Sequence, residues 1–257
     1  MTETGQSIED LVQLGLGARP PQVWSLLVTL FGDLAQTDGQ EISAQLIGAL
    51  AARMHVKPEA TRVALHRLRK EGWIESRKVG RNSRYRLAQE GRAQTRAASP
   101  RIYGETQPVQ RCWLALYDIS AGPAQKGVAL YPSAPQIRVT TEPPQGAFAF
   151  EITGEVDVPL WVRARLLPDD VLALARDVET RLRGLLEGLS RREVSDPKDI
   201  AALRLLVVHQ WRRLILRVPA VPDHVLPDGT GIAESRALKT TLLQMLPRPE
   251  VAHLDTL

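Results

Sequence analysis

The segment Lys57–Leu87 constrains the fold of this chain more than any other stretch of it. Pro58 suits the first position of a helix, and apolar side chains follow it at helical spacing as far as Leu68. Gly72 ends the helical pattern, after which the residue types become those of a strand. Gly80 lies where two such strands would turn, a position that favours a residue tolerant of positive φ. The segment therefore predicts a helix followed by a β-hairpin.

Two further helices are predicted upstream of this segment. The first begins at Pro20-Pro21 and buries one apolar face, formed by Trp24, Leu27, Phe31 and Leu34. The second has Ser43 as its N-cap and buries Leu46, Ile47, Leu50 and Ala51. The turn Met54–Lys57 leads from it to the basic helix. Three helices and a hairpin in this order predict a winged helix-turn-helix.

The charge of the chain is strongly uneven. Between Arg53 and Arg101 there are fourteen lysines and arginines but four acids, so this segment carries +10 and the remainder −6. The overall charge of +4 hides this polarity. Such a basic segment is typical of a phosphate-binding surface, although a solvated charged helix is the alternative. We expect duplex DNA as the partner of this segment.

The predicted DNA contacts divide by their position on the helix and hairpin. Arg62, Val63 and His66 share the outward face of the helix and are predicted to meet base edges. Arginine can donate two hydrogen bonds to a guanine edge, whereas histidine discriminates less between bases. For His66, a role as an ordinary surface histidine therefore stays open. The residues predicted to meet the phosphate backbone or to form the hairpin turn are Lys57, Arg67, Lys70, Arg77, Lys78, Arg81, Asn82 and Arg84. Trp73 is predicted to lie in the core and to anchor the hairpin.

The remaining sequence predicts an α+β chain of three domains. A polar helix over Ala88–Ala98 is expected to end at Ser99-Pro100, and short strands of an antiparallel sheet follow at Cys112–Ile119, Gly127–Tyr131, Gln136–Thr140 and Ala147–Thr153. Helices are then predicted from Asp169 to Leu189 (with Leu172, Val178, Leu182 and Leu185 buried), over Pro197–Leu216 and over Ala233–Leu246. We place the domains at residues 1–98, 99–189 and 190–257, the last of them helical.

Composition argues against several classes of protein. The single cysteine, Cys112, excludes a disulfide framework within the chain, and no apolar run approaches the length of a membrane span. The five histidines are scattered, and the chain has neither a phosphate-cradling glycine loop nor a G-x-S-x-G motif. We therefore expect a cytoplasmic protein that is not an enzyme and holds no metal or resident cofactor.

Six motifs, in order along the chain, resemble those of the PaaX-like transcriptional repressors of phenylacetate degradation. They are TLFGD (Thr29–Asp33), TRVALHRLRKEGWI (Thr61–Ile74), GRNSRYRL (Gly80–Leu87), RIY (Arg101–Tyr103), HQWRRLIL (His209–Leu216) and VPAVPDHVLP (Val218–Pro227). The resemblance implies a homodimeric repressor of an aromatic catabolic pathway. It also implies release from operator DNA by an aryl acyl-CoA effector such as phenylacetyl-CoA.

The resemblance further implies a ferredoxin-like middle domain that helps dimerisation. Only Ala121–Lys126 separates the first two predicted strands, which is too short for the first helix of that fold, so we expect a trimmed version. Asp118 matches a metal-binding Asp of a related nuclease fold, which leaves a metal-dependent nuclease as an alternative function. One carboxylate does not make a two-metal site, so a structural role at the end of the strand is preferred.

Four residues of the HQWRR motif are candidates for binding the effector. Arg212 and Arg213 would meet the CoA phosphates, and Trp211 or His209 would lie against an adenine or aryl ring. The competing and preferred interpretation is that the motif packs its helix against neighbours. An RNA-binding or scaffolding winged helix is a further alternative. It is less favoured because the major groove of RNA is too narrow for a helix.

Overall fold

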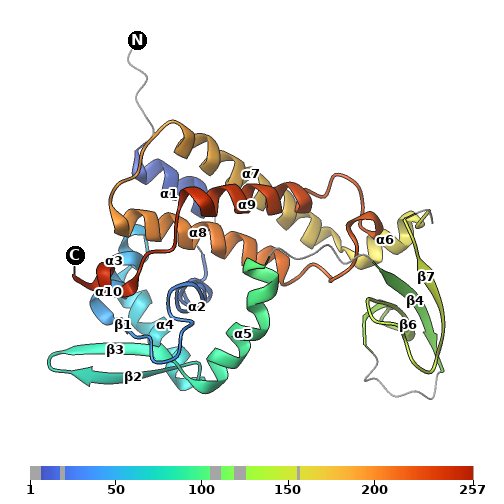
Figure 1. Ribbon diagram of the computed structural model, residues 1–257, viewed down its shortest axis with the longest axis horizontal. Helices are drawn as coiled ribbons and strands as arrows, with labels where there is room; N and C mark the ends of the chain where they lie inside the picture. Colours follow the sequence, from blue (N-terminus) through green and yellow to red (C-terminus); the bar gives the residue numbers. More distant parts are fainter. Residues whose placement is uncertain (1–6, 18–20, 105–110, 119–125, 155–156, 257) are drawn as a thin grey trace, which may run out of the picture.

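The computed structural model describes residues 7–17, 21–104, 111–118, 126–154 and 157–256. These residues form a helical body and two small antiparallel sheets, one beside the body's basic helix and one at its far end (Figure 1). The predicted α+β class is confirmed. No helix in the described part of the chain is long and apolar enough to cross a membrane.

Helix α8 (Pro197–Ile215) is the central element of the helical body. All residues from Ala201 to Trp211 are buried, so this helix is surrounded on every side rather than amphipathic. It packs against α1 (Ile8–Leu16), α2 (Val23–Leu34), α3 (Ala44–Arg53), α5 (Gln89–Tyr103), α7 (Asp169–Ser190) and α9 (Ile232–Met245). Figure 1 shows α8 running between α7 and α9 on one side and α2, α3 and α4 on the other.

Helices α2, α3 and α4 (Pro58–Lys70) form in the predicted order. Ser43 caps α3 by accepting a hydrogen bond of 3.0 Å from the Leu46 amide, and the four predicted residues of α3 are buried. Helix α2 begins at Val23, after the proline pair, of which Pro20 lies outside the described residues. On its predicted apolar face Trp24 is only half-buried, because its indole reaches across to α4.

The hairpin follows α4 as predicted. Gly72 has a φ of 71°, and β2 (Ile74–Val79) pairs antiparallel with β3 (Asn82–Leu87) through a turn in which Gly80 has a φ of 59°. The short strand β1 (Ile42–Ser43) pairs with β3, which gives the order β1-β3-β2. In Figure 1 the hairpin projects from the helical body. Trp73 is half-buried and donates to Gln94 of α5, so it links the hairpin to α5 at the edge of the core.

Helix α5 corrects one prediction, because it continues through Ser99 and Pro100 to Tyr103. Proline lacks the N–H that a helix interior uses, so a helix end was expected here. Tertiary contacts hold the last turn: Ile102 is buried, and its carbonyl accepts a hydrogen bond of 3.1 Å from the Trp211 indole. The helix thus crosses residue 98 without a break.

The second sheet contains β4 (Cys112–Tyr117), β5 (Val128–Tyr131), β6 (Ala134–Thr140) and β7 (Ala147–Ile152) in the order β5-β6-β4-β7. All pairings are antiparallel, as predicted, and Ile119 lies outside the described residues. Residues 141–146 connect β6 to β7 without a helix. One face of the sheet exposes Leu116, Phe148 and Phe150, and the two phenylalanine rings lie 4.9 Å apart.

Helix α7 forms as predicted, but Val171 and Ala175 are buried where Leu172 is only half-buried. In the described part of the chain, three short α-helices were not predicted: α1, α6 (Leu160–Leu166) and α10 (Val251–Thr256). The 3-10 helix η1 (Asp223–Val225) was not predicted either. Helix α7 packs on α1, α8 and α9, within the helical body. The three-domain division stays a prediction. It can be tested at α5 and α7, because one predicted boundary falls within α5 and the other at the end of α7.

Candidate nucleic-acid interface

A groove of about 540 Å³ lies between α3, α4 and β3. Arg62, His66 and Arg69 of α4 line it, together with Gln45 of α3 and Tyr85 of β3. The three α4 residues are four and three positions apart, a spacing that places them in a row on one face of a helix. All three are exposed. The groove therefore presents two guanidinium groups and an imidazole to the solvent from a single helix face.

Ion pairs distinguish two groups of cations in the basic segment. Arg53, Arg67, Arg77, Arg84, Arg86 and Arg92 each pair with a carboxylate. The cations of α4 and the hairpin that form no ion pair within the described ranges are Lys57, Arg62, Arg69, Lys70, Lys78 and Arg81. This second group lies along α4 and at the tip of the hairpin, where no internal carboxylate neutralises it.

Arg67 turns away from the groove and braces α4 against α2. Its Nε donates to Glu71 at 2.8 Å, and its guanidinium lies 5.2 Å from the centre of the Trp24 ring. The Trp24 indole also donates to Glu71, at 3.0 Å. The hydrogen bond from Arg67, and then that from Trp24, lower the pKa of the Glu71 carboxyl. Val63, next to Arg62 on α4, stays exposed over 69 % of its surface.

The hairpin pairs two like charges, because Arg77 of β2 lies directly opposite Arg84 of β3. Like charges in this position repel each other, and each of these has a carboxylate partner from outside the hairpin. Glu41 accepts two hydrogen bonds from Arg77, at 2.7 and 2.8 Å, and Arg77 is the main cause of the lowered pKa of Glu41. Asp255 of α10 accepts from Arg84 at 3.1 Å. Asn82, exposed beside the turn, begins β3.

Contacts from the C-terminal elements reach both ends of α3. Asp255 also accepts a hydrogen bond of 2.6 Å from the Ser43 hydroxyl, which is the N-cap of α3. At the other end Arg53 donates at 2.7 Å to Asp199, in the first turn of α8, and at 3.1 Å to Asp196, the N-cap of α8. Helix α3 and the hairpin are therefore fixed to the C-terminal part of the chain through polar and charged side chains.

The four predicted effector residues lie in three different surroundings. Trp211 is buried in the core and donates to the Ile102 carbonyl. His209 and Arg213 line a polar cleft between α2, α7 and α8, whereas Arg212 lines a small apolar cavity between α2, α5 and α8. The structure does not bring the four together around one ligand-sized space.

The buried imidazole of His209 is neutral. Burial, and then the charges of Arg212 and Arg213, lower the pKa of His209 to about 3. Its Nδ1 lies 3.1 Å from the Thr29 hydroxyl, so the ring has a polar partner inside the core. This geometry gives His209 a packing role between α8 and α2.

The described residues contain no group of three or more His, Cys, Asp and Glu side chains that could hold a metal ion. Asp118 directly follows β4 and is exposed. Cys112 is buried, and burial raises the pKa of its thiol to about 11, which keeps it protonated and unreactive.

Sequence reasoning missed four residues of this surface. Arg69 was recognisable, because it continues the spacing of Arg62 and His66 along α4. Tyr85, Glu41 and Asp255 gave no local signal, since each reaches the surface only through contacts between segments distant in the sequence.

A cation-lined groove on one helix, with a basic hairpin beside it, defines a protein suited to bind a polyanionic partner. Residues 22–91 match the family model described as PaaX-like protein, and residues 170–255 match that of the PaaX-like protein C-terminal domain. Transcriptional repressor PaaX of Escherichia coli (strain K12) is 28% identical, over 96% of this chain and 88% of that protein. The chain belongs to the PaaX-like family, as its motifs predicted, and this is a family of regulators rather than enzymes.

Proposed function

We propose that the chain is a DNA-binding transcriptional repressor of an aromatic, phenylacetate-type catabolic pathway. One observation carries the proposal: Arg62, His66 and Arg69 form an exposed row on α4 in which neither arginine has an ion-pair partner among the described residues. A relative named as a transcriptional repressor, similar over nearly the whole chain, supports it. In this proposal α2, α3, α4 and the hairpin act as a winged helix-turn-helix.

In the proposed complex α4 enters the major groove. Arg62 donates to a guanine edge, and Val63 and His66 meet neighbouring bases. Lys57, Lys70, Lys78 and Arg81 meet phosphates, with Asn82 at the turn. Arg67, Arg77 and Arg84 are proposed as weaker phosphate contacts, because each already holds a carboxylate.

The proposed repressor is a homodimer on two half-sites about 34–36 Å apart, or a multiple of that distance. The sheet β4–β7 supports this part of the proposal as a trimmed ferredoxin-like unit that keeps four antiparallel strands. Phe148 and Phe150 are exposed over 68 % and 54 % of their surfaces, an apolar face that a second copy of the chain would cover. Sedimentation of Phe148→Ser beside the unaltered chain tests this contact, since loss of the dimer is expected.

An aryl acyl-CoA thioester such as phenylacetyl-CoA is the proposed effector. It releases the operator only if it binds the DNA-free state more tightly than the DNA-bound state. A shift of that equilibrium from 1:99 to 99:1 needs about 10⁴-fold differential affinity, or roughly 5.5 kcal/mol.

A gel-shift experiment tests the proposed function. The probe is the promoter DNA beside the chain's own gene, and the control is a duplex of the same length and base composition in scrambled order. We expect tighter binding to the promoter and release by phenylacetyl-CoA but not by free CoA. Equal affinity for the two duplexes contradicts sequence-specific repression, and retained binding with every aryl thioester contradicts the effector class alone.

A further inference from the structure

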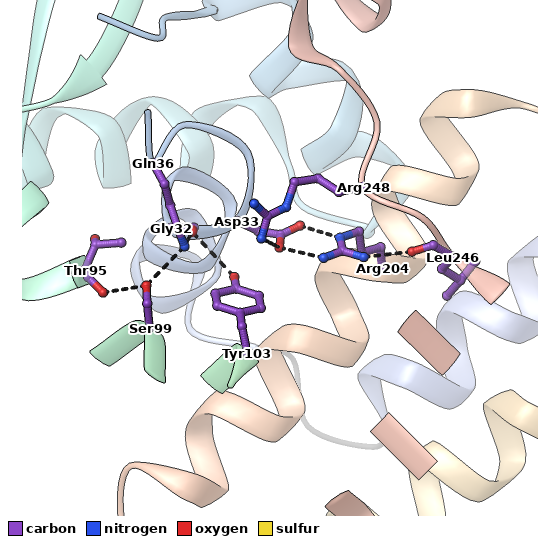
Figure 2. Close-up of polar contacts among 9 residues, drawn as sticks. All are labelled: Gly32, Asp33, Gln36, Thr95, Ser99, Tyr103, Arg204, Leu246 and Arg248. Atoms are coloured by element: carbon purple, nitrogen blue, oxygen red, sulfur yellow. Dashed lines mark hydrogen bonds and ion pairs between the residues drawn. The ribbon is translucent and has the colours of Figure 1, made fainter. Parts of the chain in front are cut away.

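A cavity of about 130 Å³ lies between α2, α5 and α8. Its walls are mostly apolar, with Val28 from α2, Ala98 and Ile102 from α5, and Leu216 after α8. Trp73, which joins α4 to β2, also lines it. Figure 2 shows part of this wall, where Gly32 of α2 and Gln36 just after it face Thr95, Ser99 and Tyr103 of α5.

One buried polar group of the cavity wall has no hydrogen-bond partner in the described part of the chain, and another has no counter-ion there. The Thr95 side chain is 8 % exposed, and its hydroxyl oxygen forms no hydrogen bond within the described part of the chain. Arg212 is half-buried and donates to Thr29 and Ser25 but, among the described residues, forms no ion pair. A buried hydroxyl without a partner and a shielded cation without a counter-ion both favour a ligand that accepts hydrogen bonds.

We propose that this cavity binds a small aromatic ring carrying a carbonyl or carboxylate oxygen. An apolar protein cavity of roughly 150 Å³ accepts benzene, so the present one has about the size of a single ring. The apolar walls hold the ring, Arg212 supplies the charge that attracts the oxygen, and Thr95 supplies a hydroxyl with no other use.

The position of the cavity gives such a ligand a route to the DNA-binding surface, a step that rests on the proposed function. Helix α5 follows β3 with only Ala88 between them. It lies so close to Trp73 that a Cβ on Gly91 would come within 2.2 Å of the Trp73 carbonyl oxygen. A ring bound in the cavity presses on Trp73, which lines the same cavity and lies against α5. Because Trp73 joins α4 to the hairpin, the two DNA-contacting elements move relative to each other and operator affinity falls.

Gly32→Ala tests the cavity without damage to the fold. A Cβ at Gly32 would meet only Thr95 Cγ2, at 3.8 Å, so the methyl group occupies the cavity without a clash. Gly184→Ala in α7 is the matched control, because its Cβ would also make only ordinary contacts, with Leu14 at 3.5 Å. Both changes replace a helical glycine by alanine, which favours the helix.

Calorimetric titration with sodium benzoate measures binding, with sodium acetate as a probe that has the carboxylate but no ring. We expect benzoate to bind the unaltered chain and Gly184→Ala equally, and Gly32→Ala at least tenfold more weakly. Thr95→Val, which keeps the side-chain shape, should weaken benzoate binding severalfold without lowering the melting temperature. Acetate should not bind. Equal benzoate affinity in Gly32→Ala, or no benzoate binding to the unaltered chain, overturns the proposal.

The same proteins in the gel-shift experiment separate this inference from the proposed function. We expect Gly32→Ala to bind the promoter like the unaltered chain but to keep it when benzoate is added. Benzoate binding without any promoter binding refutes the repressor and leaves the cavity assignment standing. Promoter binding that benzoate leaves unchanged, despite its binding to the cavity, refutes the coupling through α5 and Trp73.

Discussion

Arg204 of α8 and Arg62 of α4 use the same guanidinium group in opposite ways. Arg204 of α8 is buried and donates to both carboxylate oxygens of Asp33, at 2.8 and 3.2 Å, and to the Leu246 carbonyl at 2.9 Å (Figure 2). Arg62 of α4 is exposed, and no carboxylate within the described ranges pairs with it. The difference shows that burial and counter-ions, rather than residue type, decide whether an arginine stabilises the fold or is available to a partner.

Asp33 is the centre of the buried charges. Arg204 meets it from α8, and Arg248 approaches its Oδ1 at 3.3 Å from the segment after α9. Tyr103 of α5 lies beside this cluster, and burial, with the Asp33 charge as the next cause, raises the pKa of its phenol. Two segments distant in the sequence are thus held to α2 by one carboxylate.

Loss of the Asp33 carboxylate should have the largest effect. We expect Asp33→Ala to lower the free energy of unfolding by about 3–5 kcal/mol, because it leaves Arg204 buried without a counter-ion. Denaturant unfolding followed by circular dichroism measures this. Asp38→Ala is the control, since the Asp38 carboxylate is exposed and its pair with Arg92 should contribute no more than about 1 kcal/mol. Similar losses in both variants would contradict the distinction between buried and exposed charges.

Loss of Arg62 should affect DNA binding and leave stability unchanged. We expect Arg62→Ala to weaken promoter binding by about 1–3 kcal/mol and to relax the preference at one base pair. Binding to a set of single-base promoter variants measures both effects. Arg183→Ala, on the exposed face of α7, should change neither. A uniform loss over all promoter variants would show that Arg62 meets phosphate instead of a base.

The lowered pKa of His209 makes the stability of the body depend on pH. The folded-state pKa of about 3 lies below the usual value of 6.5, so the unfolded chain binds the proton more readily. Stability is therefore fully present above pH 6.5 and falls as the pH drops toward 3. We expect about 1–2 kcal/mol to be lost between roughly pH 7 and pH 5. Unfolding of His209→Gln at both pH values is the test: an unchanged pH dependence would assign the effect to other groups.

Changes in the hairpin should have the smallest effect on DNA binding. They compare two exposed arginines, Arg81 and Arg77, of which only Arg77 forms an ion pair within the described part of the chain. Arg81→Ala should reduce the slope of binding affinity against salt concentration by about one unit without changing base preference. Arg77→Ala should reduce it less, because Glu41 already balances that charge. Promoter binding over a series of salt concentrations measures both variants. An equal reduction would mean that Arg77 leaves Glu41 when DNA binds.

The features predicted correctly from the sequence are those fixed by local signals. The spacing of Thr61, Leu65 and Leu68, with Gly72 and Gly80, located α4 and the hairpin because capping, periodicity and positive φ act over a few residues. The continuation of α5 past Pro100 was missed, because contacts with α8 outweigh the local preference of proline. The contacts that α8 makes with other helices could not be predicted from the sequence either. Arg204 finds Asp33 at a separation of 171 residues, which no spacing pattern records.

Helix α5 also has a mechanical consequence. At 15 residues it is a rod of roughly 22 Å. One end is attached to the hairpin through the Ala88 amide and the Trp73 carbonyl, and the other to α8 through Ile102. For a rod of roughly 22 Å, a tilt of about 3° about one end moves the other by about 1 Å. Because the helix is continuous between its two attachments, a tilt that small about its Ile102 end moves the hairpin end by about the same 1 Å.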